Sequence, residues 1–471
     1  METNHQEAFE VSNYRTQVAN SDSFDDDGRP KRTGDFLTAS AHIISAVIGS
    51  GVISLAWAFA QLGWVAGLSL LILFSVVTYY ASCFLAACYR TENQATGNRN
   101  YTYLHCVRSH LGRMNATLCG CVQYANLFGT AVGYTISASI SMMAVRRSNG
   151  HRNSGGKNRC KIMISFAIFQ ILLSQISEFD KFSWLPIVPG VMSFTYSVIA
   201  LYLGITKVIG NRTVRGSLTG VSIGVMSESQ KFWRCFQALG NIASAYSYAT
   251  ILIEIQDKIK SPPEESKTMS KAISVSALVT SIFYLLCGSV GYAAFGDASP
   301  RNLLTGFGFY KSYWLVDIAN VAILVHLVAA FQVDCQFMFL FIENLAAKQF
   351  PDSDFIKKEF EVPVPGCEPL KLNLFRLVSR TTFVICCTGI AILVPFSTDI
   401  VELIRTISYW PLTVYFPVEM YIVQTRIRKW STKWICLQML SATCFVLIML
   451  AAVGSTAGLL HKVYNPLMPG Y

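Results

Sequence analysis

Charged residues are scarce in this sequence, and their scarcity excludes an ordinary soluble protein. Only 14% of its 471 residues are charged, whereas 52% are hydrophobic. A soluble chain of this length carries about a quarter charged residues, because it must cover its surface with groups that water solvates. The sequence therefore predicts an all-α, polytopic membrane protein.

The sequence also lacks the patterns of a metal site and of an active site. Its 14 cysteines include no CxxC pair with a second pair at the spacing of a zinc site. Several of them lie inside apolar segments, where cysteine packs as a small hydrophobic residue. No nucleophile, acid and base form a catalytic constellation. We therefore expect no metal, no cofactor and no enzymatic activity.

The net charge of +10 is spread over short loops. This distribution indicates contact with anionic lipid rather than with nucleic acid. No cleavable signal peptide is visible. Residues 1–34 are polar and contain an acidic run at Asp25, Asp26 and Asp27. We therefore expect a disordered cytosolic tail, followed by a transmembrane domain over residues 35–471.

Long apolar segments alternate with charged or Gly/Pro-rich loops along the rest of the chain. About eleven of these segments are long enough to cross a bilayer. They lie at 38–61, 64–89, 116–145, 162–178, 184–206, 233–256, 271–294, 312–342, 374–396, 400–423 and 434–460. We assign a first half to about 36–206, a second half to about 233–423 and an extra helix to about 434–460.

The distribution of Lys and Arg predicts the orientation. More of them lie in the tail and the even-numbered loops than in the loops on the opposite side, and the richer side is normally cytosolic. We therefore expect a cytosolic amino terminus and an extracellular carboxyl terminus. Asn211 would then lie outside, in a glycan acceptor tripeptide that also arises by chance.

The first apolar segment is interrupted near its middle. Residues 46–58 read AVIGSGVISLAWA, with Gly49, Ser50 and Gly51 at membrane depth. Glycine lets the chain leave helical geometry without steric penalty. Two half-helices would then present amide and carbonyl groups to a central chamber, as in many secondary transporters. The alternative is that these small residues only allow close helix packing.

A second candidate interruption lies in the sixth segment. Residues 238–248 read ALGNIASAYSY, in which Gly240 and small residues accompany the polar Asn241 and Ser244. The first and sixth segments are corresponding members of the two halves. Paired interruptions at such positions are typical of inverted-repeat transporters.

Several longer stretches carry a family resemblance. They are SAHIISAVIGSGVISLAWAFAQLGW (40–64), YYASCFLAACYR (79–90), GNRNYTY (97–103), TILIEIQDKIKSPPE (250–264), GYAAFG (291–296), VHLVAAFQV (325–333) and YWPLTVYFPVEMYI (409–422). They resemble the plant amino acid permease family, in the amino acid/auxin permease branch of the amino acid–polyamine–organocation superfamily. The resemblance runs from about residue 31 to the carboxyl terminus. It implies a LeuT-like 5+5 inverted-repeat bundle with one extra helix, and proton-coupled import of amino acids across the plasma membrane.

On this interpretation an amino acid binds at the paired interruptions. Its carboxylate would lie on the backbone amides of Ser50, Gly51 and Val52. Its amine would face carbonyl groups near Val47 and Ile48 and polar groups near Asn241 and Ser244. Its side chain would contact the third and eighth spans. The expected substrate-binding residues are Val47, Ile48, Gly49, Ser50, Gly51, Val52, Tyr124, Asn126, Gly129, Asn241 and Ser244.

Three ionisable side chains inside the spans are candidates for the coupling proton, because charge in a membrane is costly and is normally kept for function. They are His42, His326 and Asp334. Histidine titrates near the pH range over which a proton-driven carrier works, although either imidazole could instead be neutral and bonded to a backbone carbonyl. Asp334 follows His326 by about two helical turns, so we expect the two side chains to share a face.

The chain departs from the family pattern at several polar positions. Asn241 stands in GNIASAY where the family pattern reads GDIAFAY, and asparagine cannot take up a proton. Asp334 stands where family members carry an apolar residue. Glu402 and Arg405 occupy a segment that is glycine-spaced in the family, and their separation allows them to pair on one helix face. These departures motivate an alternative function, that of a non-transporting or coupling-impaired amino acid sensor or regulatory relative with the same fold.

Overall fold

The structure, a computed structural model, describes residues 25, 27, 31–92, 97–148, 156–176, 187–221, 227–307, 313–351, 353–362, 370–394 and 397–464. Most of them are helical. The α-helices are α2 (Phe36–Val47), α3 (Leu55–Ala87), α4 (Tyr103–Ser148), α5 (Gly156–Ser174), α6 (Ile187–Asn211), α7 (Glu228–Ala245), α8 (Ala249–Gln256), α9 (Glu265–Phe295), α10 (Tyr313–Gln349), α11 (Asp354–Lys357), α12 (Leu374–Leu393), α13 (Ser397–Tyr409), α14 (Phe416–Gln424) and α15 (Thr432–Tyr464).

Shorter elements connect these helices. They are the 3₁₀ turns η1 (Ser50–Ser54), η3 (Gly296–Ala298) and η4 (Leu303–Phe307), the π-helical turn η5 (Trp410–Tyr415), and an antiparallel hairpin of β1 (Glu359–Val362) and β2 (Leu370–Asn373). The hairpin lies in the connection between α10 and α12, where the sequence indicated only a loop.

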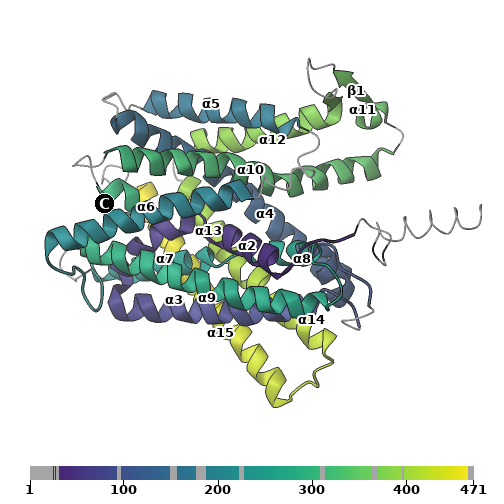
Figure 1. The fold of residues 1–471 in the computed structure, drawn as a ribbon, viewed down its shortest axis with the longest axis horizontal. Coiled ribbons are helices and arrows are strands. Elements are labelled where there is room, and N and C mark those ends of the chain that lie inside the picture. The colour runs from purple at the N-terminus through teal and green to yellow at the C-terminus, as the bar shows by residue number, and fades with distance from the viewer. Residues whose placement is uncertain are drawn as a thin grey trace, which may run out of the picture.

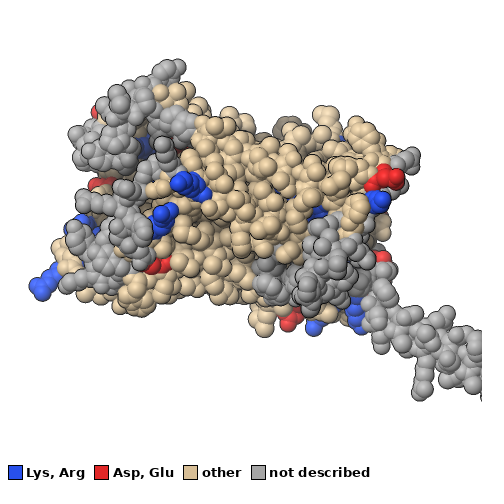
Figure 2. Space-filling view, turned by 90° about the horizontal axis from the view of Figure 1, so that it is seen from above, with Lys and Arg blue, Asp and Glu red and all other residues tan. Residues whose placement is uncertain are grey.

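Seven helices in the described part of the chain are long and apolar enough to cross a membrane. They are Gly51–Ala87, Tyr103–Ser148, Ile187–Asn211, Glu265–Ala298, Trp314–Gln349, Leu374–Leu393 and Thr432–His461. Large apolar side chains such as Leu172 and Leu278 point outward, and Figure 2 shows a broad uncharged belt with Lys, Arg, Asp and Glu gathered toward its two ends. The predicted all-α, multi-pass class is confirmed. The count of about eleven spans stays a prediction, because the segments at 233–256 and 400–423 are each divided into shorter helices.

The helices lie roughly side by side, and the chain enters α2 from the right in Figure 1. Arg32 and Tyr89 both bind the side chain of Asp257, so the start of α2, the end of α3 and the end of α8 lie at one end of the bundle. We call this the Arg32 end. The loops at 212–221 and 296–307 lie at the opposite end, which we call the Arg301 end.

Gly63 separates the first two predicted spans within α3. Its backbone is left-handed, with φ +78° and ψ 177°, a conformation that favours glycine. A Cβ atom at this position would lie 2.4 Å from both the amide nitrogen of Gly220 and the carbonyl oxygen of Leu218. The chain can therefore turn here against the 212–221 loop only because residue 63 has no side chain.

The last residues of the expected tail make defined contacts. Gly34 donates to the carbonyl of Lys258 and accepts from the amide of Lys260, each at 2.9 Å, so it forms a short parallel bridge with the segment after α8. Arg32 binds the carboxylates of Asp25 and Asp27. Within the predicted disordered tail, Gly34 is therefore held by backbone hydrogen bonds and Arg32 by carboxylates, and the disorder of the tail stays a prediction. The rest of the predicted tail, apart from Asp25 and Asp27, lies outside the described residues.

Candidate functional site

The predicted interruption of the first span is present. Helix α2 ends at Val47, Ile48 has φ −76° and ψ 85°, and Gly49 is extended with φ −122° and ψ −157°. The chain then resumes as η1, which continues directly into α3. A Cβ on Gly49 would meet no atom within 4 Å, whereas a Cβ on Gly51 would lie 3.3 Å from that of Ala245 in α7. Gly49 therefore borders open space, and Gly51 serves close helix packing.

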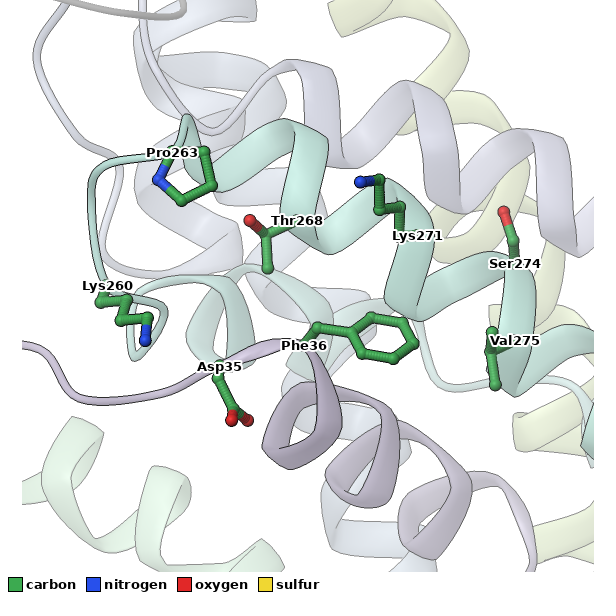
Figure 3. Close-up of a pocket in the computed structure, with 8 residues that line it drawn as sticks. All are labelled: Asp35, Phe36, Lys260, Pro263, Thr268, Lys271, Ser274 and Val275. Carbon is green, nitrogen blue, oxygen red and sulfur yellow. The ribbon is translucent and has the colours of Figure 1, made fainter.

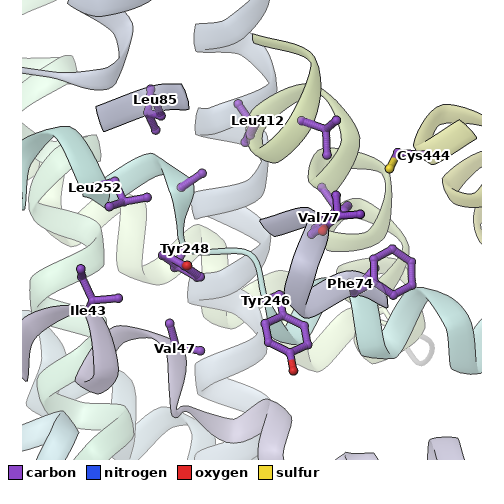
Figure 4. Close-up of a cluster of buried hydrophobic side chains, with 14 of the residues drawn as sticks. Ile43, Val47, Phe74, Val77, Leu85, Tyr246, Tyr248, Leu252, Leu412 and Cys444 are labelled. Carbon is purple, nitrogen blue, oxygen red and sulfur yellow. The ribbon is translucent and has the colours of Figure 1, made fainter. Parts of the chain in front are cut away.

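The interruption of the sixth span lies at the end of the predicted stretch, not at its glycine. Helix α7 runs to Ala245, and the backbone leaves helical geometry at Tyr246 and Tyr248 before α8 begins. Gly240 lies within α7, where a Cβ would come 2.8 Å from the Thr406 side chain. Close packing against α13 explains this glycine. Figure 4 shows Tyr246 and Tyr248 at the bend, with Val47 of the first interruption near them.

The two interruptions are joined by one hydroxyl group that the sequence did not single out. The hydroxyl of Tyr284 on α9 lies 2.5 Å from the carbonyl oxygen of Val47 and 3.1 Å from that of Ala245, so its one proton is shared between the two acceptors. These carbonyls end α2 and α7, so each lies at the negative end of a helix dipole. The Val47 carbonyl also accepts from the Gly49 amide at 2.9 Å. The convergence of the two carbonyls creates a site suited to a cationic or hydrogen-bond-donating group. A tyrosine in an apolar span gives no sequence signal of such a role.

Polar side chains link the first interruption to α7 and α13. Ser54 donates from Oγ to the Gly51 carbonyl at 2.8 Å and to Asn241 Oδ1 at 3.0 Å. Asn241 Nδ2 lies 3.5 Å from Glu402 Oε1. Ser244 instead donates to the carbonyl of Asn241 in its own helix. Of the two predicted polar residues of α7, Asn241 thus contacts the interruption and Ser244 does not.

Glu402 and Arg405 do not form the pair that their spacing predicts. Glu402 Oε2 binds Arg301 at 3.1 Å, and Arg301 also lies 3.5 Å from Asp399. The guanidinium of Arg301 covers the ring of Trp57, 4.6 Å from its centroid. Arg405 acts electrostatically on Asp334 of α10. Partners from other elements therefore override the local spacing.

The predicted residues of the third span have separate surroundings. Tyr124 stacks on Phe341 of α10, with ring centroids 4.0 Å apart. Gly129 faces Ile404 of α13 at ordinary contact distance. Asn126 has a buried side-chain oxygen with no hydrogen-bond partner among the described residues. Of the three, Asn126 retains a free group that a ligand could satisfy.

The three proton candidates contact different helices. His326 Nδ1 lies 2.9 Å from Ser193 Oγ and 3.0 Å from the Pro189 carbonyl, and the side chain is buried against α6. Asp334 accepts from Tyr134 of α4 at 2.6 Å. His42 is half-buried in α2. The expected shared face of His326 and Asp334 therefore does not bring these two side chains together, because an eight-residue step turns the helix well beyond two full turns.

A hollow of about 660 Å³ lies between the start of α2, the loop before α9 and the first turns of α9. Figure 3 shows the side chains that line it. Lys260 and Lys271 line it, together with Phe36. It lies at the Arg32 end, away from both interruptions. Asn211 lies at the opposite end, where its Nδ2 donates to the Ala294 carbonyl at 3.2 Å.

Comparisons with known proteins identify the family. Residues 32–461 match the family described as transmembrane amino acid transporter protein. The chain belongs to this family. It is 58% identical to amino acid permease 3 of Arabidopsis thaliana over all of both chains, and 58% identical to amino acid permease 2 of the same plant, over 95% of this chain and 92% of that one. The predicted resemblance is confirmed.

A solved structure shares the fold. The crystal structure of MhsT in complex with L-phenylalanine superposes with a TM-score of 0.55 at 12% identity, covering 90% of this chain and 99% of that one. The predicted LeuT-like arrangement is confirmed at the level of the fold. As a member of the transmembrane amino acid transporter family, the chain is a multi-pass membrane transporter and not an enzyme.

Proposed function

We propose that this transporter is a proton-coupled symporter that imports amino acids across the plasma membrane. The observation that carries the proposal is the pair of interruptions, where two helices end in carbonyl groups that converge on Tyr284 beside the start of η1. The names of the similar Arabidopsis permeases support amino acids as the substrate class. The excess of Lys and Arg supports a cytosolic Arg32 end, with the amino terminus inside and the carboxyl terminus outside.

The interruptions offer complementary groups to the two charges of an amino acid. The first amides of η1 suit the carboxylate, because η1 runs into α3 and carries the positive end of its dipole. Gly49 leaves open space beside these amides. The amine suits the carbonyls of Val47 and Ala245, where it would compete with the hydroxyl of Tyr284. The substrate side chain would extend toward α4 and the free oxygen of Asn126.

Among the proton candidates, the contacts favour Asp334. Its carboxylate lies inside a span, accepts from Tyr134 and is within electrostatic reach of Arg405. His326 lies against the Pro189 carbonyl and Ser193 in a buried setting, as a structural histidine does. We propose that Asp334 carries the coupling proton and that His42, on the half-helix that ends at the interruption, modulates it.

Uptake of radiolabelled amino acids in cells expressing the chain tests the site. In Gly49→Leu the new side chain enters the open space beside the η1 amides, so we expect KM to rise by about tenfold or more. The matched control is Gly389→Leu, because a Cβ on Gly389 also meets no atom within 4 Å but lies in α12. Unchanged uptake in Gly49→Leu would contradict the proposed site.

Two-electrode current recordings with a panel of amino acids test the coupling. We expect inward currents that grow as the external pH falls and that lose this pH dependence in Asp334→Asn. Amino acid binding without current or uptake would instead support the sensor alternative.

A further inference from the structure

The two departures at Asn241 and Glu402 lie in contact. Asn241 is on α7 and Glu402 is on α13, yet Nδ2 of the first lies 3.5 Å from Oε1 of the second. An amide on α7 therefore faces a carboxylate on α13.

The chemistry of the contact fixes the orientation of the Asn241 amide. A carboxylate can only accept hydrogen bonds, so Asn241 must turn its NH₂ group toward Glu402. Its Oδ1 then faces Ser54, which donates to it at 3.0 Å and also donates to the carbonyl of Gly51. Glu402 thus sets the geometry of a pair of side chains at the first interruption without reaching the interruption itself.

A cation stabilises the negative charge of Glu402 on the side facing away from Asn241. Arg301 binds its other oxygen at 3.1 Å and covers the Trp57 ring. The Glu402 side chain is only 17% exposed, and a carboxylate in such a setting needs a cation or strong donors. The contacts run in one line from Arg301 through Glu402 and Asn241 to Ser54.

We propose that Asn241 and Glu402 form a matched pair, in which Glu402 acts as a positioning residue for Asn241 and Ser54. This inference rests on the proposed function for its effect on uptake. An aspartate at position 241 would place two carboxylates side by side, which is unfavourable. Asn241→Asp should therefore be harmful as long as Glu402 is present.

The test is a double-mutant cycle of Asn241→Asp, Glu402→Gln and both together. We expect Asn241→Asp alone to raise the uptake KM by about tenfold. In the double variant, the new amide on α13 can donate to the new carboxylate on α7, so KM should return to within about threefold of the value for Glu402→Gln alone. A purely structural role would lower the melting temperature and the amount of protein but leave KM unchanged.

Asn320→Asp is the matched control. Asn320 is also a buried asparagine within a span, where its Nδ2 donates to the Val316 carbonyl. Asn320→Asp shows how far a buried aspartate in a span by itself changes the uptake KM and the melting temperature. Glu402→Gln should not reverse these changes. Equal effects of Asn241→Asp with and without Glu402, or no effect of Asn241→Asp at all, would overturn the matched pair.

A second readout separates this inference from the proposed function. The same double-mutant cycle can be measured with the melting temperatures of the purified variants, and this measurement does not depend on transport. If the wild-type chain neither binds nor carries amino acids, the proposed function fails, and the melting cycle still tests the pair. Rescue of stability by Glu402→Gln would uphold the contact, and additive losses would refute it.

Discussion

Each end of the bundle has an arginine that forms ion pairs with carboxylates from other segments, but the two arginines differ in burial and in number of partners. At the Arg32 end, the Arg32 side chain is 5% exposed and binds Asp25, Asp27 and Asp257 at 2.7–2.9 Å. At the opposite end, Arg301 is 40% exposed and reaches its two carboxylates at 3.1 and 3.5 Å.

A second cluster strengthens the Arg32 end. Glu265, at the start of α9, is 1% exposed and binds Arg90 at 2.6 Å and Arg99 at 3.0 Å. Removing one member of a buried ion pair costs about 3–5 kcal/mol, whereas exposed pairs contribute about 0–1 kcal/mol. The ion pairs therefore hold the Arg32 end closed more firmly than the Arg301 end. In the proposed orientation the Arg32 end is cytosolic, so release of the substrate into the cytosol requires the ion pairs of Arg32 and Glu265 to break.

The largest expected effect comes from breaking the most buried pair. Glu265→Gln removes the carboxylate that Arg90 and Arg99 share, and we expect it to lower the free energy of unfolding by about 3–5 kcal/mol. The measurement is the melting temperature of the purified transporter. Glu264→Gln is the control, because the neighbouring Glu264 is 32% exposed and pairs with a Lys267 that is 69% exposed. Similar losses in the two variants would contradict the difference in burial.

Arg32→Gln should loosen the same end with a smaller effect on stability, because the carboxylates around Arg32 retain 12–19% exposure. Burial alone would lower the pKa of Arg32, but the hydrogen bonds that its guanidinium donates to Asp27, Asp257 and Asp25 raise the pKa above its usual value. The side chain therefore stays charged at any working pH, and only substitution removes the bridge.

The readout for Arg32→Gln is thiol labelling of Cys88, which is buried next to Tyr89. We expect labelling to rise several-fold, as local opening exposes the end of α3. Lys31→Gln, at an exposed basic neighbour, should leave labelling unchanged. Labelling that does not respond to Arg32→Gln would show that the tail does not hold this end closed.

Between the two ends, the hydroxyl of Tyr284 contacts both helix interruptions. Tyr284→Phe leaves the carbonyls of Val47 and Ala245 without this donor, and we expect a loss of about 1–3 kcal/mol. Tyr202→Phe is the control, since Tyr202 is 55% exposed on α6. Equal melting temperatures of the two variants would show that the hydroxyl does not join the interruptions.

The two interruptions also show what the sequence could predict. The first was predictable because Gly49 allows the break, and glycine is visible in the sequence. The second lies at Tyr246 and Tyr248, where no glycine marks it, and packing against Tyr284 and α3 holds the bend. The prediction put the second interruption several residues upstream because it relied on Gly240. The structure shows that Gly240 instead allows close contact with Thr406.

Partners far apart in the sequence were the least predictable part of the site. Spacing predicted that Glu402 would pair with Arg405, whereas the loop residue Arg301 takes that role. Family patterns gave the fold and the substrate class, because long stretches specify them. They could not give contacts such as Asn241 with Glu402, since both residues depart from the pattern.

The smallest expected effect is at the Arg301 end. Arg301→Gln breaks two contacts of a guanidinium that is 40% exposed, one with Glu402 (17% exposed) and one with Asp399 (5% exposed). Because water screens the arginine but the two carboxylates are largely buried, we expect a loss of about 1–2 kcal/mol in the free energy of unfolding, still below that of Glu265→Gln. Arg215→Gln removes the same charge from an exposed residue at the same end and controls for net charge. A loss in Arg301→Gln as large as that in Glu265→Gln would mean that both ends are equally firm, since Asp399 and Glu402 would then depend on Arg301 as fully as Arg90 and Arg99 depend on Glu265. A small loss in the free energy of unfolding would mean that the Arg301 end opens more readily than the Arg32 end. A rise in the uptake KM of the same variant would mean that Arg301 acts on the first interruption through Glu402.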